Sequence, residues 1–121
     1  ILQLIADGAG ASRKERILGF IRRNGHKKLL LEELASELFL SPSRTAHLVS
    51  EEFGVGFRRL VIREKVRRIK SLLASTPMTL EQIAAELELP NAYYLGRIFK
   101  EETGIAPGRW RREAQPDGHA H

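Results

Sequence analysis

The 121-residue sequence predicts an all-α fold, and three observations support this expectation. Apolar residues recur at the i, i+3 and i+4 positions of a helix along most of the chain, as in Ile17, Phe20 and Ile21. No segment alternates apolar and polar residues with the period of two that is typical of a strand. Two stretches of the sequence also resemble each other at a fixed distance, which predicts that one helical unit occurs twice.

The first half of the chain predicts three helices of ordinary length. The first runs from Arg13 to Asn24–Gly25, a pair that suits a helix C-terminus. The second covers residues 31–38, where leucines recur at helical spacing. Ser41 is a good N-cap for the third helix, which is expected to end near Gly54.

The second half predicts one long helix followed by three shorter ones. Residues 57–73 keep their apolar side chains in helical register, and the Ser-Thr-Pro sequence at 75–77 breaks this helix. Thr79 and Gln82 form a capping box that opens the next helix. Another helix is expected to end at Thr103–Gly104, and a short last helix is expected over 107–110.

The internal repeat joins these helices into two similar units. Residues 31–38 parallel residues 80–87 at an offset of 49, and residues 51–55 parallel 101–105 at an offset of 50. Each copy reads as a helix, a tight turn and a second helix, which is the helix-turn-helix layout whose second helix can enter a DNA major groove. A generic helical hairpin is the alternative for a single copy. Two copies, joined and preceded by basic helices, favour the DNA interpretation.

The charge of the chain is concentrated in two segments. The whole sequence has 20 basic and 15 acidic residues and a formal charge of +5. Residues 13–28 and 57–70 each hold seven Lys or Arg against one Glu. Basic faces of this density attract polyanions, of which nucleic acid is the commonest, and a solvated helix face is the alternative for any single run.

Several other functions are not expected. The sequence has no cysteine, so disulfides and thiolate zinc sites are excluded, and no apolar run is long enough to suggest a membrane partner. Among the four histidines, only the terminal pair His119 and His121 offers even a weak metal alternative. We therefore expect no enzyme activity, no cofactor and no metal. Because the chain starts at Ile1 without a signal-peptide pattern, we expect a cytoplasmic piece of a longer protein.

The expected organisation follows from these boundaries. It consists of the end of an upstream domain with a linker (1–12), a first helix-turn-helix lobe (13–56), a linker helix (57–74), a second lobe (75–113) and a disordered tail (114–121).

Residues 13–112 resemble the DNA-binding region of the AraC/XylS family of transcription regulators. The residues that carry the resemblance are Leu31–Ala35, Leu40–Ser43, Gly54 and Leu72–Leu73, with Ile83–Ala84, Tyr94–Leu95, Arg97, Phe99–Lys100, Gly104, Pro107 and Trp110–Arg111 in the second copy. The resemblance implies two recognition helices in successive major grooves of double-stranded DNA. It also implies a separate N-terminal effector or dimerisation domain that this chain lacks. Lys65 stands where the family usually has Arg, and Glu88 stands where it usually has Gly, so a positive φ there would strain Glu88.

Helical geometry selects the residues expected to read DNA bases. Leu95, Ile98 and Phe99 face inward in the second copy, and Thr45, Leu48 and Val49 do so in the first. The opposite faces give the expected base-reading residues Ser43, Arg44, Ala46, His47, Ala92, Tyr93, Gly96 and Arg97. Arg97 is the strongest candidate because its planar fork can bond the O6 and N7 of guanine together, and an ion pair with Glu101 is the alternative. His47 takes the equivalent place in the first copy, and a merely exposed histidine is its alternative.

Helix N-termini and nearby cations are expected to contact phosphates. The expected residues are Ser41, Ser50, Thr79, Asn91, Lys100, Arg109, Arg111 and Arg112. The alternative function is a helical interaction module that contacts RNA polymerase or a regulatory partner, because the acidic segments 32–37 and 81–88 suit a basic protein surface.

Overall fold

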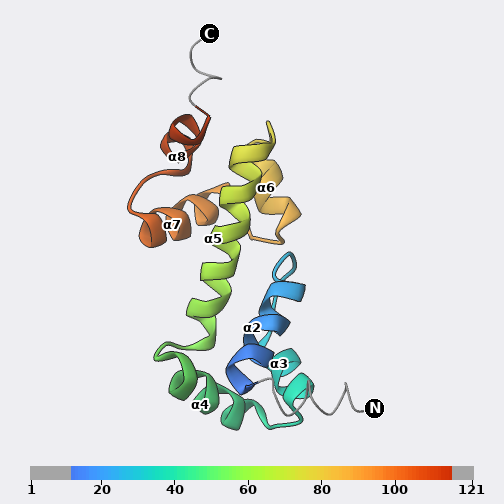
Figure 1. Ribbon diagram of the computed structural model, residues 1–121. Coiled ribbons are helices and arrows are strands. Elements are labelled where there is room, and N and C mark those ends of the chain that lie inside the picture. Colours follow the sequence, from blue (N-terminus) through green and yellow to red (C-terminus); the bar gives the residue numbers. More distant parts are fainter. Residues whose placement is uncertain (1–11, 116–121) are drawn as a thin grey trace, which may run out of the picture. The chain divides into compact units, whose positions relative to one another are not determined.

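The computed structural model describes residues 12–115 and is all-helical in that range, as the sequence predicts (Figure 1). Its helices are α2 (Arg13–Asn24), α3 (Leu31–Leu38), α4 (Pro42–Phe53), α5 (Phe57–Ser75), α6 (Leu80–Glu86), α7 (Ala92–Thr103) and α8 (Pro107–Ala114). Helix α8 is longer than the expected 107–110, because no helix-breaking residue follows Trp110 until Pro116. Residues 1–11 of the expected linker (1–12) and residues 116–121 of the expected tail (114–121), with His119 and His121, lie outside the described residues. The expected disordered tail begins too early, because Ala114 is the last residue of α8 and the Gln115 side chain donates to the carbonyls of Leu73 and Ala74.

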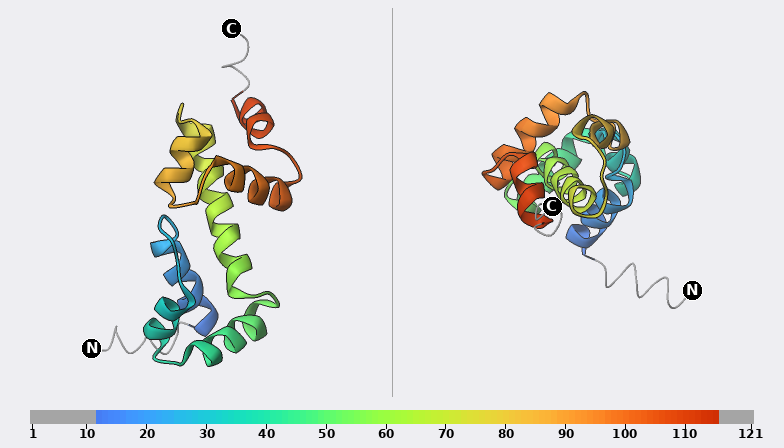
Figure 2. Two further views of the ribbon diagram at one scale, coloured as in Figure 1. Left: turned by 180° about the vertical axis from the view of Figure 1, so that it is seen from behind. Right: turned by 90° about the horizontal axis from the view of Figure 1, so that it is seen from above.

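The described chain divides into two compact units. The first unit comprises residues 12–25 and 29–61, and the second comprises residues 26–28 and 62–115. Helix α5 is one uninterrupted helix (Figures 1 and 2). The boundary between the units falls within it, after Val61, so its first turn belongs to the first unit and the remainder to the second. The expected linker helix therefore supplies core residues to both units.

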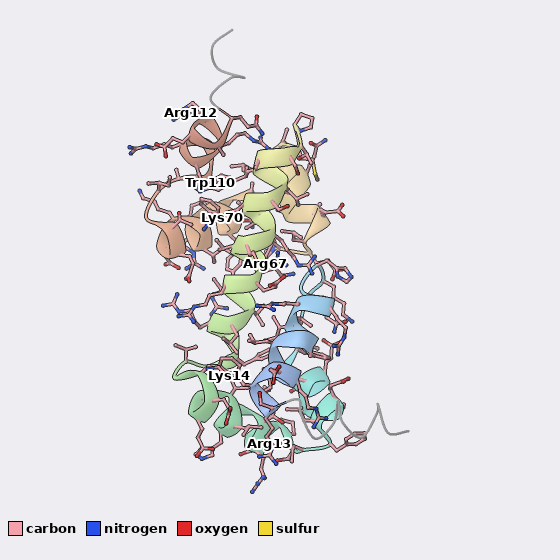
Figure 3. All side chains as sticks on the ribbon, in the orientation of Figure 1. Arg13, Lys14, Arg67, Lys70, Trp110 and Arg112 are labelled. Carbon is pink, nitrogen blue, oxygen red and sulfur yellow. The ribbon has the colours of Figure 1, made fainter. Side chains whose placement is uncertain are left out.

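Each unit has its own apolar core. The first core includes Ile17, Phe20 and Ile21 of α2, Leu34 and Leu38 of α3, Leu48 and Val49 of α4, and Leu60 of α5. The second core includes Val66, Ile69 and Leu73 of α5, Ile83 and Ala84 of α6, Leu87, and Leu95, Ile98 and Phe99 of α7. Trp110 of α8 faces α7, where its ring meets Phe99 edge-on at 6.0 Å between centroids (Figure 3). Edge-to-face contact is the favoured geometry of an aromatic pair.

The repeat includes one more helix than the sequence comparison indicated. Ile17 and Phe20 of α2 correspond, at the same offset of 49, to the buried Val66 and Ile69 of α5. The repeated unit is therefore α2–α3–α4 in the first unit and the later part of α5 with α6 and α7 in the second. The sequence comparison missed this helix, although Lys-Glu-Arg-Ile at 14–17 matches Arg-Glu-Lys-Val at 63–66 in charge and apolar character at the same offset.

The turns of the two helix-turn-helix motifs have the same backbone. Phe39 and Glu88, which are 49 positions apart, are the only non-glycine residues with positive φ in the described chain, at 58° and 55°. In each turn this residue and the next donate their N–H groups to the preceding helix. The bonds are Phe39 to Ser36 (3.2 Å), Leu40 to Ala35 (3.0 Å), Glu88 to Ala85 (3.2 Å) and Leu89 to Ala84 (2.8 Å). This is the Schellman pattern, and the strain expected at Glu88 is present in both copies.

Replacing Phe39 by glycine is expected to raise the free energy of unfolding by about 1 kcal/mol. A left-handed conformation costs an L-residue about 1–2 kcal/mol, and the greater freedom of glycine in the unfolded chain offsets part of this gain. Phe39 is 90% exposed, so the change removes almost no buried surface. Urea denaturation measures the effect. The Glu88→Gly control should gain less, because the Glu88 carboxylate accepts the Lys28 N–H at 2.9 Å. A less stable Phe39→Gly variant would contradict this account.

A buried lysine binds two backbone carbonyls inside the second unit. The Lys65 ammonium donates to the carbonyl oxygens of Lys27 and Leu87, at 2.6 Å each. Leu87 directly precedes the left-handed Glu88, so this bond and the Lys28–Glu88 bond both attach residues 26–28 to the turn after α6. Burial lowers the pKa of Lys65 to about 8, and the charge of Glu88 opposes this shift.

Candidate nucleic-acid interface

Helices α4 and α7 bury the faces that the sequence predicts. Thr45, Leu48 and Val49 are buried in the first unit, and Leu95, Ile98 and Phe99 are buried in the second. The Thr45 hydroxyl donates to the Ser41 carbonyl at 2.8 Å, so its burial leaves no unsatisfied polar group. The opposite face of each helix is therefore the accessible one.

The expected base-reading residues all lie on these accessible faces. The exposed members are Ser43, Arg44, His47, Tyr93 and Arg97, and the half-buried members are Ala46, Ala92 and Gly96. At equivalent positions in the two helices, the alternation of buried and accessible residues is the same from Thr45 to Ser50 as from Leu95 to Lys100. The two motifs thus present matching surfaces with different side chains, and the contact of these residues with DNA stays a prediction.

Each helix places a glutamate one turn after its central reading residue. The Arg97 guanidinium lies 3.5 Å from the Glu101 carboxylate and 5.1 Å from the centre of the Tyr94 ring. His47 lies 3.5 Å from Glu51 in the equivalent arrangement. The pair considered as the alternative for Arg97 is therefore present. An exposed pair of this spacing contributes about 0.3–0.5 kcal/mol, whereas a bidentate contact with guanine contributes about 1–3 kcal/mol, so the pair does not prevent base reading.

Three of the expected phosphate contacts are N-cap residues. The side chains of Ser41, Thr79 and Asn91 accept the backbone N–H of the third residue of α4, α6 and α7, at 3.1, 3.1 and 2.7 Å. Their oxygens are thus occupied within the helix. The remaining N–H groups of these first turns form the positive end of the helix dipole, which favours anions. Ser50 and Lys100, at equivalent positions in α4 and α7, are both exposed.

The arginines of α8 have different environments. Arg111 donates to the carbonyls of Leu73 at 3.1 Å and Thr76 at 3.2 Å, so it caps the C-terminal end of α5. Arg109 pairs with Glu113 at 3.2 Å, and Arg112 is exposed (Figure 3). Sequence reasoning missed the capping role of Arg111, because Arg111 and Leu73 are 38 positions apart and no local pattern joins them.

Two carboxylates and the burial of Lys65 reduce the positive surface of the basic segment 57–70. Glu64 is buried, and its carboxylate accepts Arg67 at 2.6 Å and Arg68 at 2.8 Å. The hydrogen bond to Glu64 raises the pKa of Arg67. Arg63 pairs with Glu102 at 3.4 Å, and Lys65 is buried as described above. The charge count of this segment therefore overstates the positive surface that α5 offers to a polyanion.

Membrane-spanning helices and metal-binding clusters are both absent from the described residues. None of the helices between Ser12 and Gln115 combines the length and apolar character needed to cross a bilayer. The same residues contain no cluster of three or more His, Cys, Asp or Glu side chains that could hold a metal ion.

Comparison with known proteins places these helices in a family. A family model described as a helix-turn-helix domain matches residues 34–113. The HTH-type transcriptional regulator YtdP of Bacillus subtilis is 30% identical over 108 residues, which are 89% of this chain and 14% of YtdP. The solved C-terminal domain of AraT, a response regulator from Geobacillus stearothermophilus, is 26% identical with a TM-score of 0.71, over 84% of this chain and 88% of that domain.

A second solved structure supports the same fold. The DNA-binding domain of AdpA, described as a global transcriptional factor and solved in complex with a target DNA, gives a TM-score of 0.75 at 16% identity. The alignment covers 84% of this chain and 91% of that domain. The chain spans only 14–36% of the first three curated relatives that it matches. The family match covers about two thirds of the chain, and the chain therefore belongs to the AraC/XylS type of helix-turn-helix DNA-binding transcription regulators.

Proposed function

We propose that this chain binds double-stranded DNA sequence-specifically and thereby regulates transcription. Helices α4 and α7 act as recognition helices that enter successive major grooves. The observation that carries the proposal is the duplicated outward face, on which Arg44 and His47 of α4 and Tyr93 and Arg97 of α7 are exposed. Family membership and the length of α4 and α7, 12 residues each, agree with helices that fit a groove.

Selection of bound sequences from a random pool of double-stranded DNA tests the proposal. Two recognition helices in successive grooves should select a split site whose two parts have centres about 10 base pairs apart. A single short site would contradict the use of both helices. Failure to bind any DNA at low salt would contradict the function itself, because the electrostatic part of binding is strongest there.

The role of the whole protein is also a proposal. The chain matches only a part of its longer relatives, so we propose that a separate effector or dimerisation domain belongs to the complete protein. We propose that it works in the cytoplasm, without catalysis or a cofactor. Contact with RNA polymerase is the second candidate, supported by the exposed Glu32 of α3 and Glu81 of α6. A gel shift at two salt concentrations separates the two functions, since a protein-binding module would give no DNA shift at either.

Replacing Gly96 by alanine is expected to separate folding from DNA binding. A Cβ at Gly96 would meet no atom within 4 Å apart from its chain neighbours and the backbone of its own helix, and alanine favours a helix over glycine by about 1 kcal/mol, so stability should rise. The same methyl group would stand between the α7 backbone and the base edges, so affinity should fall by about fivefold, or about 1 kcal/mol. Fluorescence anisotropy and urea denaturation measure the two effects. The equivalent residue Ala46 already has a Cβ, and Ala46→Gly is expected to lower stability without weakening DNA binding. Unchanged affinity in Gly96→Ala would contradict a close approach.

The separate substitutions of Arg111 and Arg112 are expected to affect different properties, namely the stability of the fold and the salt dependence of DNA binding. Arg111→Ala removes a donor from two carbonyls at the end of α5 and should lower the free energy of unfolding by about 1–2 kcal/mol. Arg112→Ala should leave stability within about 0.5 kcal/mol and reduce the slope of log affinity against log salt by about 0.9, as the loss of one phosphate contact does. Urea denaturation and a salt series measure these effects. A stable Arg111→Ala variant would contradict the capping role.

A further inference from the structure

A hollow lies beside the outward face of α4 in the first unit. Its volume is about 500 Å³, and it is lined by side chains of α4, by Leu40 and by Arg13 at the start of α2. Leu48 and Leu40 form its apolar part, and Arg13 and Arg44 contribute two exposed guanidinium groups. Figure 3 labels Arg13 at the end of α2 that adjoins α4. The hollow thus extends the accessible surface of α4 onto a second helix.

The charge of this hollow favours an anion. Among the described residues that line it, the one carboxylate is that of Glu51, which lies 3.5 Å from His47, also part of the lining. The guanidinium groups of Arg13 and Arg44 therefore outnumber the carboxylate. Guanidinium groups bind phosphate in a bidentate fork, which a lysine cannot do.

The position of Arg13 is not explained by the stability of α2. Arg13 is the first residue of this helix, after the N-cap Ser12. A positive charge in the first turn opposes the helix dipole, so the side chain is mildly unfavourable to its own helix. A role outside the helix accounts better for a cation at this place.

The second unit distributes its cations differently. At the offset of 49 that relates α2 to α5, Arg13 corresponds to the half-buried Ile62. At the offset of 50 that relates α4 to α7, Arg44 corresponds to Tyr94. The second unit instead has Arg97 where the first has His47. The first unit therefore lacks a guanidinium at the central reading position and has two at the side of the hollow.

We propose that Arg13 binds a backbone phosphate of the DNA strand that borders the groove entered by α4. This inference rests on the proposed function and adds to it a DNA contact from α2. A phosphate bound at this point fixes the orientation of α4, and so compensates for the weaker reading by His47. The neighbouring Arg44 remains available for the bases.

The test compares Arg13→Ala with Arg22→Ala. Arg22 is nine residues further along α2, which is two and a half turns or about 13 Å, so its side chain leaves the helix on the opposite side. Arg22→Ala removes the same charge as Arg13→Ala and is therefore the matched control. Affinity is measured by fluorescence anisotropy over a salt series, on the selected site and on unrelated DNA. Arg13→Ala should weaken binding to both DNAs by about fivefold and reduce the salt slope by about 0.9, and Arg22→Ala should change neither. Arg13→Lys should keep the slope of the unmodified chain, because it keeps the charge.

The other outcomes distinguish an error in the Arg13 contact from an error in the proposed function. If Arg13→Ala behaves like Arg22→Ala while Arg97→Ala still weakens specific binding, the Arg13 contact is wrong and the proposed function stands. If Arg13→Ala changes the preferred base at one position and leaves the salt slope unchanged, the contact is to a base and the phosphate assignment is wrong. If the unmodified chain binds no DNA even at low salt, the proposed function fails, and the Arg13 contact fails with it. Urea denaturation of both variants checks that any change in affinity reflects folded protein.

Discussion

Replacing Arg97 by alanine is expected to weaken binding to the preferred DNA site by about 1–3 kcal/mol, or roughly 5- to 150-fold. Arg97 is exposed at the centre of the α7 face, and its guanidinium can bond both acceptors of a guanine. Within the described residues its partners before binding are the exposed Glu101 and the Tyr94 ring, and their loss costs far less than the new contact provides.

Affinities for a set of sites that differ by one base pair at a time measure this effect. Arg97→Ala should remove the preference at one base pair and leave the preference at the others. Glu101→Gln is the matched control, because it removes the partner of Arg97 and keeps the guanidinium, and its affinity should stay equal or rise. Uniform weakening of Arg97→Ala on every sequence would indicate a phosphate contact and contradict base reading.

The stability of the chain relative to a Lys65→Met variant is expected to increase by about 3 kcal/mol between pH 7 and pH 10.5. The pKa of Lys65 is about 8 in the folded chain and 10.5 in the unfolded chain. Between these values the unfolded chain holds a proton that the folded chain has released, so rising pH favours the folded state. Below pH 8 both states are charged, and the full cost of burying the ammonium is present. Each step of one in pKa corresponds to 1.36 kcal/mol, which gives the magnitude.

Urea denaturation of both proteins across this pH range measures the difference between their free energies of unfolding. The other titrating groups are the same in both proteins, so their contributions cancel in this difference. Lys65→Arg is a second reference, because it keeps donors near the Lys27 and Leu87 carbonyls and does not titrate in this range. The chain should gain stability with pH against either reference. A difference that is flat, or that falls as the pH rises, would show that burial does not disfavour the charge of Lys65.

The helices and the orientation of the reading faces could be predicted from the sequence. Seven helices were expected, and α2, α3 and α4 end within one residue of the expected positions. The capping box of Thr79 and Gln82 forms with bonds of 2.8 and 3.1 Å. Such features depend on residues three or four positions apart, so the local sequence is enough to specify them.

The local pair of Arg97 with Glu101 could be anticipated from its spacing, but the partners of charged residues that are far apart in the sequence could not. The sequence showed seven cations in residues 57–70, but it did not show that Arg63 pairs with Glu102 or that Lys65 reaches the carbonyl of Lys27. Arg13 is one of seven cations in the other basic segment, residues 13–28, and nothing in the charge pattern distinguishes it from the rest. Its position in the first turn of a helix, where a cation is unfavourable, is shared by Lys14, so the sequence alone could not single out Arg13.

The sequence by itself determined where most of the helices begin and end, that the helix-turn-helix motif is duplicated, and which face of α4 and α7 is accessible. Helix α8 is the exception, since it continues to Ala114, past the expected end at Trp110. The tertiary structure decided which cations remain available for DNA, and it placed Arg13 beside α4 and Arg111 at the end of α5. The physical reason is distance along the chain. Periodicity and capping act over one helical turn, whereas the partner of a charged side chain is chosen by packing between helices that are tens of residues apart.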